Sequence, residues 1–355
     1  MVAGFDTPGM TLSKGLFLLA ILAVGGCDAS TTTVLAAGAG AGGAGGAGAS
    51  AGGGQGGGTS GTAGGGAAGG VSAGASGSAG SAGNGAGGAS AGAAGGSGTG
   101  ATNCKRGSAY GYTSADDLTA VSPGVRWWYN WSPRPDEGVA SAYQQLGVEF
   151  VPMIWGEGDL KAERVAMIPP GSRYLLGFNE PNFKSQSNLS AKQAAALWPQ
   201  VEAIAKARNL TLVSPALNFC GPESNCWSTD PFVWFDEFFA SCPGCQVDHI
   251  AVHWYACSKD ALSWYLGQVK DRYKRSIWLT EFSCLDDGAL KGDPAKQAAY
   301  MSDALTLLEG DPMVFRYAWF SGRWKDTPAV DLLGSPGQLT ALGQQYLSTK
   351  ATCSP

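Results

Sequence analysis

The sequence predicts a single α/β domain with the (β/α)8 fold, also called the TIM barrel. Eight short apolar runs occur within residues 104–355, helical patterns separate most of them, and about 250 residues is a usual size for such a barrel. Strands that alternate with helices form a parallel sheet through crossover connections. An open doubly wound sheet is less consistent with the chain, because no glycine-rich phosphate loop follows the first run.

Each of the eight predicted strands is an apolar run that closes near a polar or aromatic residue. The first and fifth runs are short, so the predicted number of strands depends on these two. In chain order the runs are Gly107–Tyr112, Val125–Trp131, Val148–Trp155, Tyr174–Glu180, Leu212–Ala216, Ile250–Tyr255, Ile277–Phe282 and Val314–Phe320.

Two of the intervening helices have recognisable starts. Segment Ser190–Arg208 begins with Ser190 and Gln193 at the spacing of a capping box. Later, Asp293 is a predicted N-cap, and Pro294 occupies the first helical position. The apolar faces that follow these starts are Ala194, Leu197, Val201 and Ile204 in the first helix, and Ala298, Met301, Leu305 and Leu308 in the second.

Residues 28–103 lie ahead of the barrel and consist mainly of Gly, Ala, Ser and Thr. Such a stretch has too little apolar area to offset the entropy of ordering it. We therefore predict a disordered tether, with a root-mean-square span of roughly 40–50 Å. A collagen-like structure is not favoured, because the regular Gly-X-Y period is absent.

Residues 1–27 have the pattern of an export signal. Lys14 precedes the apolar run Leu16–Val24, which is too short to cross a bilayer. The Val-Gly-Gly-Cys ending resembles the lipobox of bacterial lipoproteins, which implies that Cys27 is lipidated and that the protein is anchored at the bacterial cell envelope or extracellular surface. Cleavage by an ordinary signal peptidase is the alternative, and a start at Met10 would leave a more usual leader.

Eight cysteines remain when Cys27 is set aside, and an even set in an exported chain predicts disulfides. Spacing does not fix the pairing, although Cys104 and Cys353 bracket the domain and could join its ends. Cys242 and Cys245 have redox-motif spacing, but no thioredoxin-like pattern surrounds them, so we favour a structural bridge. With two histidines in the chain, we expect no metal site and no cofactor.

The charge of the chain bears on its partners. The net charge is −5, and no cluster of Lys and Arg is present, so we expect no binding to nucleic acid. We expect a monomer that contacts a membrane only through its lipid anchor.

Two of the predicted strands end in a glutamate. Glu180 ends the fourth run and Glu281 the seventh, and 101 positions separate them. Strand ends of a barrel converge on one mouth, so the two carboxylates can meet there. Paired carboxylates in a cleft are what glycoside hydrolysis needs, and a separation of about 5–5.5 Å gives retention of configuration. A salt-bridged structural role is the alternative for either glutamate alone.

The segments around the glutamates resemble a known family. The Asn-Glu-Pro sequence at 179–181 resembles the motif of clan A glycosidases. Together with His-Trp-Tyr at 253–255 and Trp-Leu-Thr-Glu-Phe at 278–282, it makes the chain resemble glycoside hydrolase family 128, which comprises endo-β-1,3-glucanases and relatives with a "glycosyl hydrolase catalytic core" domain. The resemblance covers roughly Lys105–Tyr346.

The resemblance implies a retaining endo-β-1,3-glucanase that acts on β-glucan polysaccharide or oligosaccharide by double displacement. Glu180 would be the acid/base, which requires a raised pKa. Glu281 would be the nucleophile and must stay ionised. Asn179 would hydrogen-bond the 2-hydroxyl of the sugar.

Other candidates for binding substrate also lie at strand ends. The aromatic residues Trp131, Trp155, Tyr255 and Trp319 could stack on sugar rings, although such residues are as often part of the core. Trp131 and Trp155 are favoured, because a polar or glycine-rich loop follows each. Asn218 could contact substrate or cap its loop.

His253 lies two residues before Tyr255, so both point to the same side of a strand. We expect His253 to hydrogen-bond Glu281 and position it, the alternative being a satisfied core histidine. His249 is expected to be structural.

Two further functions fit the same pattern. The glutamate motifs define a mechanism better than a linkage, so another clan A β-glycanase is possible. A non-catalytic carbohydrate-binding or cell-wall barrel is the alternative from a different class, and the presence of both glutamates argues against it.

Overall fold

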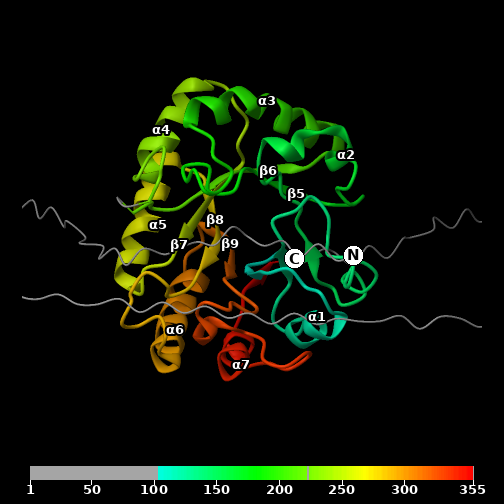
Figure 1. Ribbon diagram of the computed structural model, residues 1–355, viewed down its shortest axis with the longest axis vertical. Coiled ribbons are helices and arrows are strands. Elements are labelled where there is room, and N and C mark those ends of the chain that lie inside the picture. Colours follow the sequence, from blue (N-terminus) through cyan, green and yellow to red (C-terminus); the bar gives the residue numbers. More distant parts are fainter. Residues whose placement is uncertain (1–102, 222–223, 355) are drawn as a thin grey trace, which may run out of the picture. The chain divides into compact units, whose positions relative to one another are not determined.

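The computed structural model describes residues 103–221 and 224–354. An eight-stranded parallel sheet curls into a barrel, and helices surround it (Figure 1). Each of the eight predicted runs overlaps a strand, and the predicted (β/α)8 fold is confirmed. The barrel strands are β2 (Arg106–Ala109), β3 (Trp127–Tyr129), β4 (Glu149–Phe150), β5 (Tyr174–Leu176), β6 (Thr211–Leu217), β7 (His249–Trp254), β8 (Ser276–Phe282) and β9 (Val314–Trp319).

The strands follow the order β4-β3-β2-β9-β8-β7-β6-β5 around the sheet, so the first and last barrel strands are neighbours. Between β4 and β5 the seam is closed by a parallel bridge from Met153 to Leu176, whose carbonyl accepts the Ile154 amide at 3.0 Å. Pro152 also faces β5, and its carbonyl accepts the Leu176 amide, but proline has no amide to donate. These contacts join β5 to the segment that follows β4 and close the barrel.

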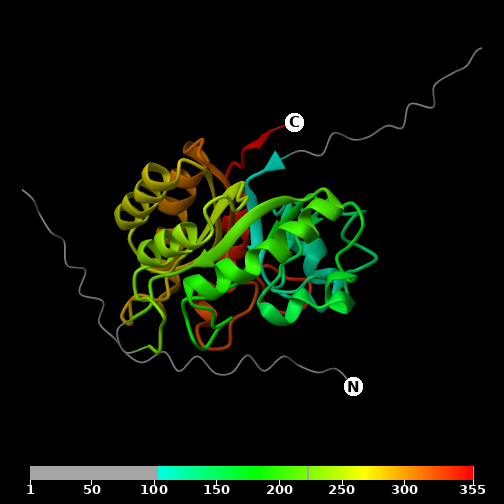
Figure 2. The same ribbon diagram turned by 90° about the horizontal axis from the view of Figure 1, so that it is seen from above.

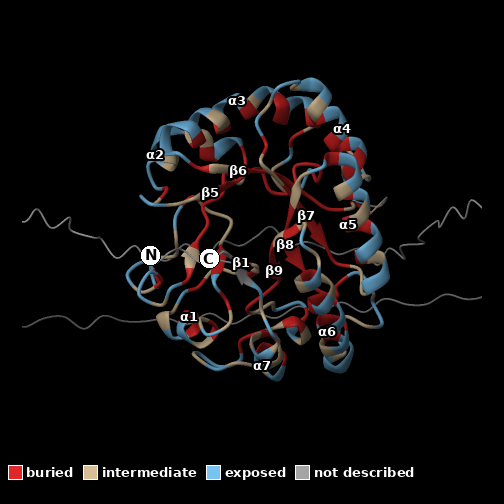
Figure 3. Ribbon diagram, turned by 180° about the vertical axis from the view of Figure 1, so that it is seen from behind, coloured by how far each residue is buried: buried red, intermediate tan, exposed pale blue. Residues whose placement is uncertain are grey.

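The helices form the outer layer around the strands (Figure 2). Their outward faces are exposed and the strands within are buried (Figure 3). The elements are α1 (Ala115–Val121), η1 (Glu157–Leu160), α2 (Ala162–Val165), α3 (Ala191–Arg208), α4 (Pro231–Ser241), α5 (Lys259–Tyr273), α6 (Pro294–Gly310), η2 (Pro328–Val330) and α7 (Ala341–Ser348), where η marks a 3-10 helix. Within the described ranges, no helix combines the length and apolar character needed to span a bilayer.

Both predicted helix starts are confirmed. The Ser190 and Gln193 side chains form the capping box of α3, and Asp293 accepts hydrogen bonds from the first amides of α6. The buried face of α3 differs from the prediction. It is centred on Trp198, which is fully buried, whereas Leu197 lies at the edge of the interface.

Three disulfides join described residues: Cys220–Cys226, Cys242–Cys245 and Cys257–Cys284. Cys242 is the C-cap of α4, where the helix dipole disfavours a thiolate, so this position supports the structural reading of the pair. At the chain ends, the short strands β1 (Asn103–Cys104) and β10 (Cys353–Ser354) pair antiparallel, with Cys104 opposite Cys353. The predicted signal, Cys27 and residues 28–102 of the predicted tether lie outside the described residues.

Candidate active site

The two predicted catalytic glutamates lie at the mouth of the barrel, which is the end formed by the carboxyl ends of the strands. Glu281 belongs to β8, and Glu180 follows β5. The amide of Glu180 donates to the carbonyl of Ala216 at 2.9 Å, which fixes the loop against β6. The backbone of Glu180 has a φ of 39°, a left-handed conformation that costs free energy in a non-glycine residue and is typical of functional sites.

A close approach of β5 to β6 sets the position of Glu180. A Cβ added to Gly177 would lie 2.8 Å from the backbone nitrogen of Pro215 and 2.9 Å from the Trp198 ring. Only glycine leaves room for this contact. The chain thus packs closely three residues before the glutamate.

The two carboxylates are buried together with a histidine. Glu180 and Glu281 are each 4% exposed, and His253 is fully buried. One oxygen of each carboxylate and one ring nitrogen of His253 all lie within 4.8 Å of one another. Two acidic groups at this distance interact strongly, so the ionisation of one disfavours the ionisation of the other.

Glu281 receives hydrogen bonds from three aromatic side chains. The Tyr129 hydroxyl and the Trp131 Nε1 each donate to Oε1 at 2.8 Å, and the Tyr255 hydroxyl donates to Oε2. Trp131 also has a left-handed backbone, with a φ of 58°. These three donors hold the carboxylate in one orientation.

His253 hydrogen-bonds Glu180 rather than Glu281, which the sequence analysis predicted as its partner. Its Nδ1 lies 2.9 Å from Oε1 of Glu180 and 3.5 Å from Oε2 of Glu281. The predicted hydrogen bond to Glu281 is therefore wrong in its partner. The expected common direction of His253 and Tyr255 is confirmed, because both side chains reach the glutamate pair.

The pKa values of Glu180, His253 and the two site tyrosines are all raised, through different balances of burial and neighbouring charge. Burial raises the pKa of Glu180, the charge of Glu281 raises it further, and the His253 contact only partly offsets these effects. Burial acts to lower the pKa of His253, but Glu281 and Glu180 together outweigh it and raise the pKa. The pKa values of Tyr129 and Tyr255 are raised, first by burial and then by Glu281, so both hydroxyls keep their protons and remain donors.

The predicted asparagines line the same end of the barrel. Asn179 is 3% exposed, and its Oδ1 has no hydrogen-bond partner among the described residues, so it is free to accept from a ligand. The Asn218 carbonyl accepts from the Asn182 side chain at 2.9 Å, which ties two mouth loops together. Trp155 is partly buried, and its carbonyl accepts from the Asn179 amide.

Trp319, predicted to contact substrate, points away from the mouth. It is fully buried, donates to the Val330 carbonyl at 2.8 Å, and its ring contacts Phe282, Tyr300 and Tyr346. The prediction is wrong because side chains alternate along a strand, and residue 319 falls on the side that faces the helices. The next residue, Phe320, faces the site and contacts Trp131 and Tyr255.

Tyr129 is a site residue that the sequence reasoning missed. It is the last residue of β3 and lies two positions before Trp131, and both side chains bond Glu281. That spacing was a usable signal. His249, expected to be structural, bonds the Ser276 hydroxyl at 2.6 Å at the other end of β7.

Glu180, His253 and Glu281 have the donor types of a metal site. Each already has partners, because His253 Nδ1 contacts Glu180 and three aromatic donors occupy Glu281.

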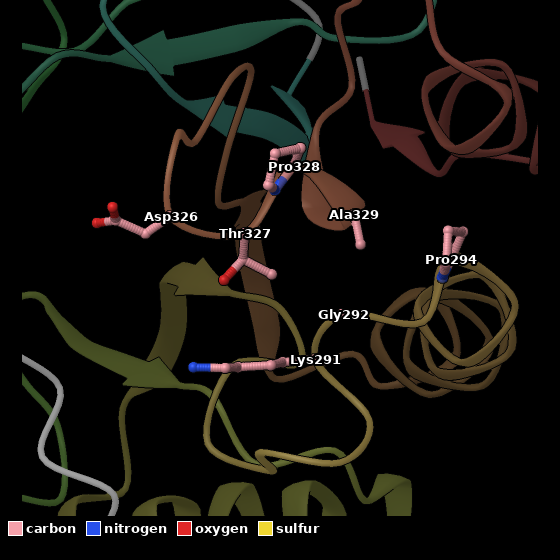
Figure 4. Close-up of a pocket in the computed structure, with 7 residues that line it drawn as sticks. All are labelled: Lys291, Gly292, Pro294, Asp326, Thr327, Pro328 and Ala329. Atoms are coloured by element: carbon pink, nitrogen blue, oxygen red, sulfur yellow. The ribbon is translucent and has the colours of Figure 1, made fainter.

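A further cavity of about 420 Å³ lies between the loops that follow β8 and β9 (Figure 4). Lys291 and Asp326 are its charged lining residues, and the others are Gly292, Pro294, Thr327, Pro328 and Ala329. The catalytic glutamates do not line it, so the cavity is separate from the carboxylate pair.

The sequence profile of a family described as "Glycosyl hydrolase catalytic core" matches residues 107–346. Solved structures of glycoside hydrolase family 128 are also similar. A subgroup II endo-β-1,3-glucanase from Sorangium cellulosum is 48% identical, with a TM-score of 0.65 and coverage of 70% of this chain and 99% of that chain. A subgroup I endo-β-1,3-glucanase from Amycolatopsis mediterranei, in complex with laminaritriose, is 33% identical, with a TM-score of 0.58 and coverage of 69% and 99%.

Two more distant relatives differ in action or in length. A subgroup III curdlan-specific exo-β-1,3-glucanase from Blastomyces gilchristii is 32% identical, with a TM-score of 0.55 and coverage of 69% of this chain and 97% of that chain. Alkali-sensitive linkage protein 1 of Schizosaccharomyces pombe is 30% identical over 238 residues. These residues are 64% of this chain and 41% of that protein, so the chain spans less than half the length of this curated relative.

Proposed function

The chain belongs to the glycosyl hydrolase catalytic core family and is a glycoside hydrolase, and from this premise we propose that it is a retaining endo-β-1,3-glucanase. The observation that carries the mechanism is the separation of the carboxylates. Oxygens of Glu180 and Glu281 lie within 4.8 Å. Inverting enzymes need about 6.5–9.5 Å between the carboxyl groups, to leave room for a water molecule, whereas retaining enzymes need about 5–5.5 Å.

In the first step, Glu281 attacks the anomeric carbon while Glu180 gives its proton to the glycosidic oxygen. The bond between that carbon and oxygen breaks, the shortened glucan leaves as an alcohol, and a glycosyl ester forms on Glu281. In the second step, Glu180 takes a proton from water, which attacks the same carbon and releases Glu281. The raised pKa of Glu180 suits the first step, because the group must hold a proton near neutral pH.

The remaining side chains have supporting roles in this scheme. Tyr129, Trp131 and Tyr255 orient the carboxylate of Glu281 for attack. The unpaired Oδ1 of Asn179 accepts a hydrogen bond from the 2-hydroxyl of the sugar. The partly exposed ring of Trp155 offers a face for stacking on the substrate.

The choice of β-1,3-glucan is supported by the endo-acting neighbours at 48% and 33% identity. Release of reducing sugar from laminarin, cellulose and xylan tests it directly. We expect activity on laminarin, with the β-anomer as the first product in proton NMR spectra. Cleavage of cellulose or xylan in preference to laminarin would assign another linkage, and an initial α-anomer would exclude retention.

Exchange of each glutamate tests the assignment of roles. Glu281→Gly should lose turnover of every substrate, and azide should restore it with an α-glycosyl azide product. Glu180→Ala should keep the first step for substrates with good leaving groups, and azide should then give the β-glycosyl azide. The reverse pattern would exchange the two roles, and full activity in both variants would exclude the pair from catalysis.

We also propose that the enzyme is exported and held at the cell envelope by a lipid on Cys27, on the basis of the lipobox-like sequence. Expressed in a bacterium, the protein should fractionate with membranes, and Cys27→Ser should release it in soluble form. Equal solubility of both forms would remove the anchor from the proposal.

A further inference from the structure

Trp227 is a large apolar side chain on the surface of a catalytic domain, with 47% of it exposed. It lies in the loop between β6 and α4. Loops that follow barrel strands lie at the mouth, on the same face as the catalytic glutamates. An exposed indole at this place has a cost in hydration that a polar residue would avoid.

The ring of Trp227 is held in place by two neighbours from another mouth loop. Its Nε1 donates to the Oδ1 of Asn188 at 2.9 Å, and the ammonium of Lys184 lies 4.6 Å from the ring centroid. Asn188 has a left-handed backbone, with a φ of 56°. A side chain held by a hydrogen bond, a cation–π contact and a strained neighbour is oriented before any ligand arrives.

The backbone beneath the ring is fixed as well. The amide of Trp227 donates to the Asn182 carbonyl at 2.8 Å, and Phe183 bridges Cys226. Cys226 is bonded to Cys220, so the loop is covalently closed. The segments 182–184 and 225–227 therefore form one hydrogen-bonded unit.

This unit lies close to the catalytic acid. Asn182 is two residues from Glu180, and its carbonyl accepts the Trp227 amide, so the α-carbons of Glu180 and Trp227 are no more than about 14 Å apart. A glucan chain that passes Glu180 can therefore also reach Trp227. The sugars at the cleaved bond lie against the buried carboxylates, whereas Trp227 is 47% exposed, so its ring is suited to a sugar further along the same chain.

We propose that Trp227, with Lys184 beside it, is a stacking platform for an outer glucosyl unit of a β-glucan chain. The apolar C–H face of a pyranose ring stacks on the face of the indole opposite the Lys184 ammonium, which keeps the ring in place. The site rests on the proposed function and deepens it, because it favours long chains over short oligosaccharides.

The experiment compares two tryptophan variants. Trp227→Ala removes the platform, and Trp264→Ala is the matched control, because Trp264 is 51% exposed but lies on α5 in the outer helix layer (Figure 1). We expect Trp227→Ala to lower kcat/KM on laminarin about five- to tenfold, in keeping with one aromatic stacking contact. On an aryl β-glucoside, and for Trp264→Ala on both substrates, we expect less than a twofold change.

Binding without turnover separates this site from the choice of substrate. In the Glu281→Gln background, Trp227→Ala should weaken retention on insoluble β-1,3-glucan, and Trp264→Ala should not. Two results would contradict the platform even if laminarin is hydrolysed. One is a loss of kcat/KM in Trp227→Ala that is as large on the aryl glucoside as on laminarin. The other is that Trp227→Ala and Trp264→Ala bind insoluble β-1,3-glucan equally well. If the wild-type enzyme prefers another glucan, the proposed β-1,3 specificity is wrong. The same two variants, assayed on that glucan, then test whether Trp227 is a stacking platform.

Discussion

At the residue scale, the carboxyl group of Glu180 is held where ionisation is unfavourable. It is 4% exposed, and its pKa is raised above the ordinary value of 4.5 by burial and by the charge of Glu281. In the unfolded chain neither effect acts. Folding therefore has a free-energy cost at neutral pH that the catalytic role requires.

Glu180→Gln should stabilise the protein at pH 7 by about 1 kcal/mol, a typical gain from relieving one unfavourable group. Because the folded-state pKa is raised, the cost of Glu180 is absent below about pH 4.5 and grows as pH rises through the folded pKa. The gain in the free energy of unfolding should fade between pH 7 and pH 4 in denaturant titrations.

Glu149→Gln is the matched contrast. Burial opposes ionisation of Glu149, but Arg316 at 2.6 Å and Arg173 at 2.5 Å outweigh it and lower the pKa. This carboxylate stabilises the fold above its unfolded pKa and loses that contribution as pH falls, so Glu149→Gln should destabilise the protein at pH 7. If both variants move stability in the same direction, the sign assigned to Glu180 is wrong.

His253→Ala should move the basic limb of the kcat/KM profile to higher pH. The hydrogen bond and charge of His253 lower the pKa of Glu180, so their removal raises the pKa of the catalytic acid further. His249→Ala is the control, because burial lowers the pKa of His249 to about 4 and its ring bonds Ser276 rather than the site. A basic limb that stays in place, or moves to lower pH, would contradict the coupling of His253 to Glu180.

The meeting of Glu180 and Glu281 could be predicted from sequence, because both follow buried runs that end at one face of a barrel. The partner of His253 could not, since two carboxylates lie within 3.5 Å of one nitrogen and less than an ångström separates the alternatives. Trp319 was misplaced by a single position in the strand. Periodicity of two distinguishes it from Phe320 only when the register is known.

At the element scale, the apolar runs predicted every barrel strand, because strands covered on both faces are continuous in hydrophobic residues. Their ends were less predictable. The run Val148–Trp155 contains only the two-residue strand β4, whose partner β3 ends before the left-handed Trp131. Trp131 donates a hydrogen bond to Glu281, a tertiary contact that no local pattern contains.

The three described disulfides should differ in their effect on stability. Their cysteines are 27, 6 and 3 residues apart for Cys257–Cys284, Cys220–Cys226 and Cys242–Cys245. Loop-closure entropy predicts losses of roughly 3.5, 2 and 1.5 kcal/mol when each pair is changed to serine. Thermal unfolding of the three double variants should rank the loss of Tm in this order, and the largest loss at Cys242–Cys245 would contradict the entropic account.

At the scale of the whole molecule, the sequence divides the chain into a tether and a catalytic barrel. The composition of residues 28–103 predicts a segment open to proteolysis. Brief treatment with elastase should leave a fragment that begins near Cys104, identified by mass spectrometry, with unchanged activity on β-glucan. Loss of activity on that cut would mean that the segment contributes to the site.

The pairing of β1 with β10 determines where anything joined to the domain is attached. The chain enters the barrel through β1 just before β2, and it leaves after α7 by returning to the same place, so both ends lie at the amino ends of the strands, opposite the mouth. A support surface, a fluorescent reporter or a second enzyme fused at residue 103 or 354 is therefore presented on the far side from the incoming polymer. The domain is suited to immobilisation or display by either terminus, because neither attachment would obstruct a long glucan strand as it reaches the carboxylates.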